Sequence, residues 1–257
     1  MKLNIERGEL LKSLGHIQSV VERRNTIPIL SNVLLESEDG RLNLAATDLD
    51  IAIGESVVAE TQEPGGITAP AHTLYDIVRK LPDGSQVELY YDLDSTRLSI
   101  SAGRSRFTLS CLPREDFPVM SEGEFPVNFK VTGVNLKRLI DKTRFAVSTE
   151  ETRYYLNGIY LHAATDDNGE NVLRGVATDG HRLARFDMDQ PEGAADMPGI
   201  IVPRKAVGEL RKLIDQYEGE VKVSLSNTKI RFSFSDIVLT SKLIDGTFPD
   251  YTLVIPE

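Results

Sequence analysis

Apolar residues recur along this chain at two different spacings. Near the start, apolar side chains four, three and four positions apart line one face of a predicted helix: Leu10, Leu14, Ile17 and Val21. In residues 97–101 and 229–234, apolar and polar side chains alternate instead, as in strands that bury one face. Residues 87–89 show the same alternation. The pattern therefore predicts a mixture of helices and strands.

Proline marks the start of two further helical segments. Pro70 and Pro203 each precede an amphipathic stretch, and proline is tolerated at a helix start because its missing N–H has no partner there. With their flanks, four helical segments are predicted at 6–24, 71–80, 133–144 and 204–217. The apolar faces of the last two are Leu136, Leu139 and Ile140, and Val207, Leu210, Ile214 and Tyr217.

Two dipeptides indicate hairpins between strands. Asp39-Gly40 and Asn168-Gly169 accept the positive φ that tight hairpin turns require. Hairpins join antiparallel strands. Together with the helices, they predict an α+β fold in which two helices pack on antiparallel sheets.

The chain also repeats itself. Four short matches occur in the same order in both halves, at offsets of 125, 131, 133 and 131: Leu11-x-x-Leu14 with Leu136-x-x-Leu139, Thr47-Asp48 with Thr178-Asp179, Pro70 with Pro203, and Phe117-Pro118 with Phe248-Pro249. Loop insertions account for the drift, and the order in each copy is strand, helix, strands, helix, strands. We predict two tandem domains, 1–123 and 124–257, with a linker at Met120–Pro126.

Composition narrows the class of protein. The 257 residues contain one cysteine, Cys111, and four histidines without metal-ligand spacing, which argues against disulfides and structural zinc. No apolar run reaches the roughly 18 residues of a membrane span, and the charged start from Met1 to Arg7 is unlike a signal peptide. We expect a cytoplasmic protein with no membrane partner and no metal or other cofactor.

Charge is distributed unevenly between the helices and the rest. The net charge is −10, which by itself argues against nucleic acid as a partner. The four helical segments, however, contain 14 lysines and arginines against seven acids, a net +7, which leaves −17 on the remaining 202 residues. A basic helical surface would bind phosphates without sequence preference. The alternative is that these are the solvated faces of ordinary amphipathic helices.

Two acidic segments invite a catalytic interpretation. Asp179 and His181 lie close together in Ala177–Ala184, but no nucleophile motif accompanies them, so a turn between strands is favoured. Asp48 and Asp50 could bind a hard metal ion. Because the second copy retains only the equivalent of Asp48, a turn or capping role is favoured there too.

Two other segments have open interpretations. Gly103–Phe107 resembles a small anion site without the pattern of a phosphate loop, and an edge strand at a protein interface explains it at least as well. Arg153–Gly158 places a cation beside two aromatics, which suits either stacking on unpaired bases or a half-buried strand.

Five motifs carry a family resemblance: Ile27–Asn32, Gly103–Phe107, Arg153–Gly158, Ala177–Ala184 and Phe248–Tyr251. In their order and spacing they resemble the first two domains of the bacterial DNA polymerase III beta subunit, the sliding clamp. The resemblance implies the DNA clamp fold and a non-catalytic processivity factor for DNA replication, without 3'-5' exonuclease activity. Such a subunit encircles double-stranded DNA and tethers the polymerase.

The resemblance also implies three sets of site residues. Contacts with DNA correspond to Arg24, Arg153, Tyr154 and Tyr155, and we add the basic helix residues Lys137, Arg138 and Lys205. The pocket for peptides of the replicative polymerase and the clamp loader corresponds to Leu156, Thr178, Gly180, His181, Arg182, Leu183, Pro249 and Val254. The subunit interface corresponds to Arg104, Arg106, Phe107 and Leu109.

The sequence departs from the family pattern in several places. His72 and Glu150 stand where basic and amide residues that contact DNA are expected, and Leu253 stands where arginine is familiar. The family has three domains per chain and closes a ring as a homodimer, whereas a third clamp domain is absent from this sequence. We therefore expect either a two-domain fragment of a longer chain, or a two-domain subunit that trimerises.

Two functions of other classes remain as alternatives. An enzyme of nucleotide or phosphate chemistry would use Asp48, Asp179 and His181. A protein-interaction module would use the same surfaces without meeting DNA.

Overall fold

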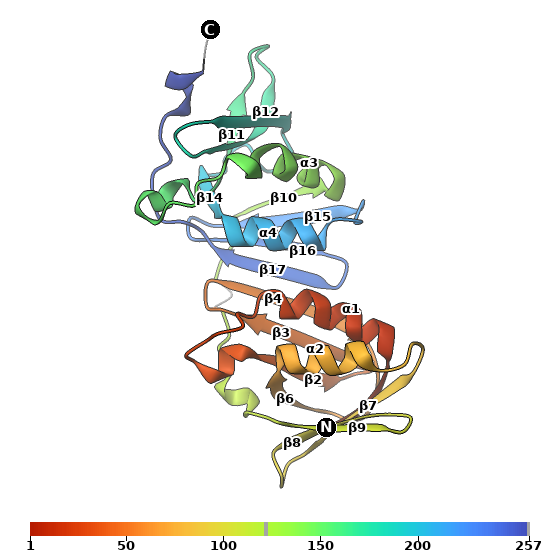
Figure 1. The fold of residues 1–257 in the computed structure, drawn as a ribbon. Helices are drawn as coiled ribbons and strands as arrows, with labels where there is room; N and C mark the ends of the chain where they lie inside the picture. The colour runs from red at the N-terminus through yellow and green to blue at the C-terminus, as the bar shows by residue number, and fades with distance from the viewer. Residues whose placement is uncertain (121–122, 256–257) are drawn as a thin grey trace. The chain divides into compact units, whose positions relative to one another are not determined.

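The computed structural model describes residues 1–120 and 123–255, and part of the predicted linker, residues 121–122, lies outside them. The chain divides into two compact units. One comprises Met1–Glu122 with Ser235–Leu239, and the other Gly123–Phe234 with Thr240–Glu257. Figure 1 labels the helices and strands of each unit.

The first unit contains two helices and nine strands within the described residues. In chain order its elements are β1 (Lys2–Glu6), α1 (Arg7–Gln18), the 3-10 helix η1 (Pro28–Ser31), β2 (Asn32–Glu38), β3 (Arg41–Thr47), β4 (Ile51–Val58), β5 (Glu60–Glu63), β6 (Gly65–Pro70), α2 (Ala71–Lys80), β7 (Gln86–Asp92), β8 (Arg97–Ala102), β9 (Ser105–Ser110) and η2 (Arg114–Asp116). One sheet has the order β5-β1-β7-β8-β9, and β4-β3-β2-β6 are neighbours in another. Neighbouring strands are antiparallel.

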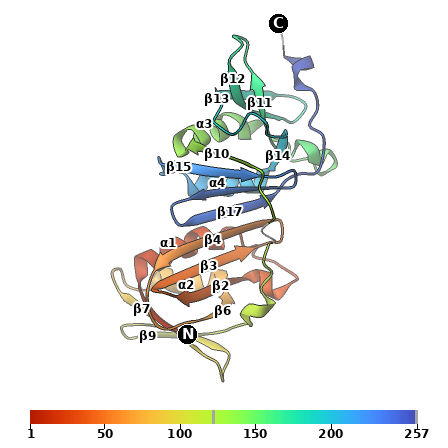
Figure 2. The same cartoon turned by 180° about the vertical axis from the view of Figure 1, so that it is seen from behind.

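The second unit repeats this order. Its elements are β10 (Val127–Thr132), α3 (Gly133–Thr143), η3 (Arg144–Ala146), η4 (Glu151–Leu156), β11 (Gly158–Thr165), β12 (Asn171–Thr178), β13 (Leu183–Asp189), β14 (Ile200–Pro203), α4 (Arg204–Leu213), β15 (Glu220–Leu225), β16 (Lys229–Phe234), β17 (Ile237–Lys242) and η5 (Tyr251–Val254). One sheet has the order β13-β12-β11-β14, and β10-β15-β16 are neighbours in another. In Figure 2, β15 is seen in front of α4.

The two copies match element by element. The run β1-α1-β2-β3-β4 corresponds to β10-α3-β11-β12-β13, and β6-α2-β7-β8-β9 to β14-α4-β15-β16-β17. Only β5 lacks a counterpart within the described residues. The predicted duplication and the antiparallel α+β fold are thereby confirmed.

The helices bury the faces that their spacing predicted. Leu10, Leu14 and Ile17 are fully buried on α1, while Val21 is buried just beyond its end. On α4, Val207 and Leu210 are buried, and the predicted face extends beyond the helix: Ile214 is its C-cap, and Tyr217 packs its ring against Phe234 at 5.1 Å. Both helical predictions were therefore a few residues too long.

The hairpin turns follow the expected backbone chemistry with one difference. Asp39 and Gly40, between β2 and β3, both have positive φ, 49° and 74°. In Asn168-Gly169, between β11 and β12, the positive φ of 85° falls on glycine, while the Asn168 N–H donates to the Asp166 carboxylate. An Asx turn thus replaces the second left-handed residue there.

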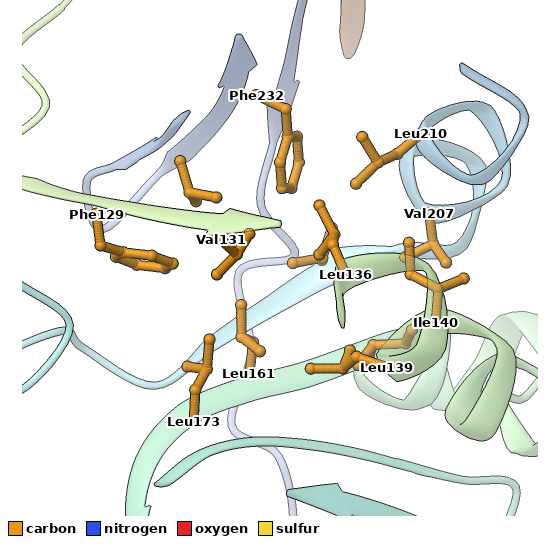
Figure 3. Close-up of a pocket in the computed structure, with 13 residues that line it drawn as sticks. Phe129, Val131, Leu136, Leu139, Ile140, Leu161, Leu173, Val207, Leu210 and Phe232 are labelled. Carbon is orange, nitrogen blue, oxygen red and sulfur yellow. The ribbon is translucent and has the colours of Figure 1, made fainter. Parts of the chain in front are cut away.

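The core of the second unit encloses a small void. Figure 3 shows side chains from α3, α4 and both sheets around it. The void of about 30 Å³ is lined only by apolar residues: Phe129, Val131, Leu136, Leu139, Ile140, Ile159, Leu161, Leu173, Val202, Val207, Leu210, Val223 and Phe232. A space of this size without polar partners is a packing defect that stays dry, and it is not a ligand site.

In the described part of the chain, no helix combines the length and the apolar character that crossing a membrane requires.

Candidate functional site

The predicted subunit-contact residues lie on an edge strand and its turn. Gly103, with φ of 57°, turns the chain from β8 into β9, with Arg104 beside it. β9 pairs with β8 and is the last strand in its sheet order. Arg106 is exposed on β9, and the Phe107 side chain is 40% exposed. An edge strand with an exposed aromatic can pair with another chain.

The predicted basic residues of the second unit are partly neutralised by acids. Lys137 on α3 donates its Nζ to both the carbonyl and the carboxylate of Asp215, at 2.7 and 2.9 Å. Arg211 on α4 binds the carboxylates of Asp141 and Asp215, each at 2.7 Å. Its guanidinium holds the pKa of Asp215 at about 2. The helical surface is thus less basic than its lysine and arginine count suggested.

Three further predicted DNA residues are exposed. Arg24 lies in the loop after α1, Arg138 lies on α3 with its guanidinium 5.6 Å from the Phe186 ring, and Lys205 lies in the first turn of α4. Lys205 and Tyr154 line one open groove together with Asn157, Pro203, Arg204 and Ile244. The structure therefore brings together two of the residues predicted to contact DNA.

Arg153, Tyr154 and Tyr155 lie on the 3-10 helix η4, so the alternative of a half-buried strand was wrong. Arg153 departs from helical geometry there, with φ of −108° and ψ of 51°. Its guanidinium binds both carboxylate oxygens of Glu150, at 2.9 and 2.6 Å. This contact lowers the pKa of Glu150 below its ordinary value. Arg153, which was predicted to contact DNA, is therefore ion-paired with Glu150 in this structure.

The two tyrosines have different surroundings. Tyr154 is 51% exposed, whereas Tyr155 packs against a buried apolar cluster. Their rings meet edge to face, with centroids 5.8 Å apart. Only Tyr154 presents a ring that could stack on a base.

The turn between β12 and β13 carries five predicted peptide-pocket residues. The Thr178 hydroxyl donates to the Arg182 carbonyl at 2.8 Å, and Asp179 accepts from the N–H groups of His181 and Arg182. These two backbone hydrogen bonds hold the pKa of Asp179 at about 2. Gly180 has φ of 87°, and a Cβ there would collide with the Arg153 guanidinium. The turn interpretation of Asp179 is thereby confirmed.

Asp48 forms the equivalent turn in the first unit. It accepts from the N–H groups of Asp50 and Ile51, at 2.9 and 2.8 Å. The favoured turn role of this segment is also confirmed.

The predicted pocket residues come from three segments that meet at one apolar cluster. The cluster comprises Leu156, Val176, Ile201, Phe248 and Tyr251, with Tyr155, Tyr160, Leu183, Ile244 and Ile255 packed around it. Leu156 and Leu183 are predicted pocket residues, and Pro249 follows the buried Phe248. Val254 and Leu253 on η5 are 68% and 81% exposed. The cluster thus has an apolar, open rim.

A group of residues beneath this rim was missed in the sequence. His162, Arg174, Asp187 and Tyr251 are linked by hydrogen bonds. A signal was present: Arg174 is a charged residue inside the apolar strand Asn171–Thr178, where charge is rare unless paired.

Two family models match the chain in sequence. The N-terminal domain of the DNA polymerase III beta subunit matches residues 1–121, and its central domain matches residues 130–250. The chain belongs to the DNA polymerase III beta subunit family.

Relatives and solved structures agree with this assignment. The beta sliding clamp of Caulobacter vibrioides is 59% identical to this chain, and the match covers 100% of this chain and 69% of the relative. The beta sliding clamp of Pseudomonas aeruginosa is 45% identical, and the match covers 100% of this chain and 68% of the relative. The sliding clamp of Bartonella birtlesii bound to griselimycin superposes with a TM-score of 0.95 at 54% identity, covering 100% of this chain and 68% of that one. Caulobacter crescentus pol III beta superposes with a TM-score of 0.96 at 59% identity, and the match covers 100% of this chain and 69% of that one.

The family assignment confirms the predicted resemblance and fold. Beta sliding clamps are non-catalytic processivity factors of DNA replication, and this overturns the alternative of an enzyme that uses Asp48, Asp179 and His181.

Proposed function

We propose that this chain holds duplex DNA through its paired helices and tethers the replicative polymerase through the apolar cluster beneath η5. The two clamp domains are assigned to residues 1–123 and 124–257, close to the compact units of the structure. The observation that carries the proposal is the convergence of three segments, η4, the β12–β13 turn and residues 248–254, on one cluster with an exposed apolar rim. Such a rim suits a short apolar peptide.

The DNA-binding part rests on Arg24, Lys137, Arg138, Arg153, Tyr154, Tyr155 and Lys205. Exposed cations on helices and loops bind the phosphate backbone without reading sequence, which suits a protein that slides. Ring closure would use the edge strand β9, and a cytoplasmic location follows from the role in replication.

The DNA contacts are tested by charge reversal. Changing Arg24, Lys137 and Arg138 to glutamate is expected to shorten the products of primer extension per binding event and to flatten the salt dependence of DNA binding. Lys222→Glu is the matched control, because Lys222 is exposed on β15 while its neighbours Val221 and Val223 face the core. Unchanged processivity in the triple variant would reject the DNA-facing assignment and favour a protein-interaction module.

The peptide pocket is tested with griselimycin, which is bound in the Bartonella birtlesii clamp. Leu183→Asp places a charge at the edge of the apolar cluster and is expected to abolish griselimycin binding measured by calorimetry. Equal affinity of Leu183→Asp and the unmodified protein would reject the pocket.

Sedimentation tests the ring. A stable trimer would support a two-domain subunit that closes by itself, whereas a monomer would leave ring closure to a longer chain.

A further inference from the structure

Three polar side chains form a row across the strands β11, β12 and β13. His162 lies opposite Arg174 in the sheet register, and Arg174 lies opposite Asp187. The Arg174 guanidinium donates to both Asp187 oxygens, at 2.7 and 2.8 Å, and the residue is only 6% exposed. A buried ion pair of this kind contributes little net stability, because desolvation offsets the attraction. We therefore look for its role in the side chains that the Arg174 guanidinium orients.

The row ends on the hydroxyl of Tyr251, and each hydrogen bond has one consistent direction. His162 Nδ1 lies 2.9 Å from the Ala163 carbonyl, which can only accept, so Nδ1 carries the proton of the neutral ring. His162 Nε2 is then an acceptor for the Tyr251 hydroxyl at 3.0 Å. Arg174 donates to the same hydroxyl oxygen at 3.3 Å. The Tyr251 hydroxyl thus donates once and accepts once.

Aromatic contacts also hold residues 248–254, through Phe248. The Tyr160 ring stacks on His162 with centroids 4.6 Å apart, and on Phe248 with centroids 4.9 Å apart and planes 6° from parallel. Phe248 and Tyr251 are both buried. Pro249 lies between these two anchors, and Val254 lies one turn beyond the second, on the blue segment of Figure 1.

We propose that Tyr251, His162 and Arg174 are positioning residues for the peptide pocket. The Tyr251 hydroxyl, held between the other two, fixes residues 248–254 so that Pro249 and Val254 stand at the pocket rim. Asp187 holds the Arg174 guanidinium in the orientation that this requires. The inference rests on the proposed peptide pocket and adds to it a row of residues that are not among the predicted pocket residues.

The row is sensitive to protonation of His162. A proton on Nε2 would turn this acceptor into a donor, and the Tyr251 hydroxyl would lose the acceptor of its own proton while still accepting from Arg174. The groups that face the ring are Arg174 from β12, Asp187 from β13, Tyr160 from β11 and Tyr251 from η5. Burial, with a smaller effect of Arg174, lowers the pKa of His162. Because the folded pKa is lowered, the contact is intact at neutral pH and is lost as the pH falls through that value.

The first test is Tyr251→Phe, which removes one hydroxyl and keeps the ring. We expect griselimycin to bind roughly fivefold more weakly, the equivalent of one net hydrogen bond of about 1 kcal/mol at 1.4 kcal/mol per factor of ten. Tyr217→Phe is the matched control, since it removes a hydroxyl that donates to the Glu220 carbonyl in the same unit. It should lower the melting temperature to a similar extent and leave griselimycin affinity unchanged.

The second test is His162→Gln, which offers an oxygen acceptor that does not titrate. Griselimycin affinity at neutral pH should stay within about twofold of that of the unmodified protein, whereas its decline as the pH falls below the ordinary histidine pKa of about 6.5 should become smaller. A purely structural role of His162 would not produce this change in the pH profile. The same pH profile in both proteins would overturn the proposal even if Tyr251→Phe failed to fold.

The outcomes separate this inference from the pocket itself. Loss of griselimycin binding in Leu183→Asp without loss in Tyr251→Phe would overturn the positioning role alone. Unchanged binding in both variants would reject the pocket, and with it the inference.

Discussion

The turns β3–β4 and β12–β13 occupy equivalent places in the two units and are built in the same way. In each, a threonine hydroxyl donates to a carbonyl four residues on, Thr47 to Ile51 at 2.9 Å and Thr178 to Arg182 at 2.8 Å. In each, an aspartate accepts from two backbone N–H groups. The chain then passes through positive φ, 78° in one turn and 87° in the other.

The two turns differ in the residue at that left-handed position. The first has Leu49, which is 43% exposed, and the second has Gly180, which lies under the Arg153 guanidinium. The left-handed backbone by itself therefore tolerates a side chain in this fold. In the second unit, a side chain at this position would in addition have to displace the Arg153 guanidinium of η4. The two turns thus share their backbone hydrogen bonds and differ in the side chain that lies beside the left-handed residue.

The largest expected effect is that of Gly180→Leu, which makes the second turn like the first. The leucine Cβ would displace the Arg153 guanidinium from its place beside the turn. We expect griselimycin to bind at least about tenfold more weakly, a loss of about 1.4 kcal/mol or more.

The reverse change, Leu49→Gly, is the control for Gly180→Leu and should leave griselimycin affinity unchanged. Gly180→Leu should also lower the melting temperature. In the double variant with Arg153→Ala, the new leucine has no guanidinium to displace, so part of this loss should be recovered. Full loss of stability in that double variant would show that positive φ is the obstacle after all.

The next effect concerns the two aspartates. Asp179→Ala and Asp48→Ala each remove a carboxylate that accepts from two N–H groups, so we expect similar decreases in melting temperature of a few degrees. Only Asp179→Ala should also weaken griselimycin binding. A large difference in melting temperature between the two variants would contradict the equivalence of the turns.

The third comparison concerns how thermal stability depends on pH in the acidic range. Backbone hydrogen bonds hold the pKa of Asp179 at about 2, below the ordinary value of 3.8 for an aspartate side chain. Because the folded pKa is the lower one, this contribution to stability is present above about pH 4 and is lost as the pH falls towards 2. Thermal unfolding of the unmodified protein should therefore depend more steeply on pH in this range than that of Asp179→Asn.

The smallest effect should come from the cation above the turn. Glu150→Gln keeps a hydrogen-bond acceptor for Arg153 but removes the negative charge. DNA affinity at low salt is expected to rise by only about two- to threefold, because solvent screens an exposed ion pair. Glu151→Gln, one residue further along, is the matched control. Equal gains in both variants would mean that net charge is responsible and not the release of Arg153.

Much of the fold could be predicted because its signals are local. The spacing of Leu10, Leu14 and Ile17 sets a helical face whatever it packs against, and Asp39-Gly40 sets a turn from its own backbone preferences. The helix ends were less certain, since Val21 is buried and Tyr217 packs against Phe234 through contacts beyond the helices that their spacing suggested.

The candidate site was predicted less completely. The Arg153 segment has the composition of a strand or a stacking platform, and its 3-10 conformation depends on the packing of Leu156 and Tyr155 into a cluster that includes Phe248. Its ion pair with Glu150 could be expected only from a three-residue spacing, which many exposed pairs share without contact.

By itself, the sequence determined that two copies of one α+β unit follow each other, where their helices and turns lie, and to which family they belong. Periodicity and offset are properties of the chain alone. The tertiary structure decided that His162 and Arg174 meet Tyr251, over separations of 89 and 77 residues, and that Arg153 lies above Gly180. Hydrogen bonds act over about 3 Å, so only the folded positions of distant segments could reveal these contacts.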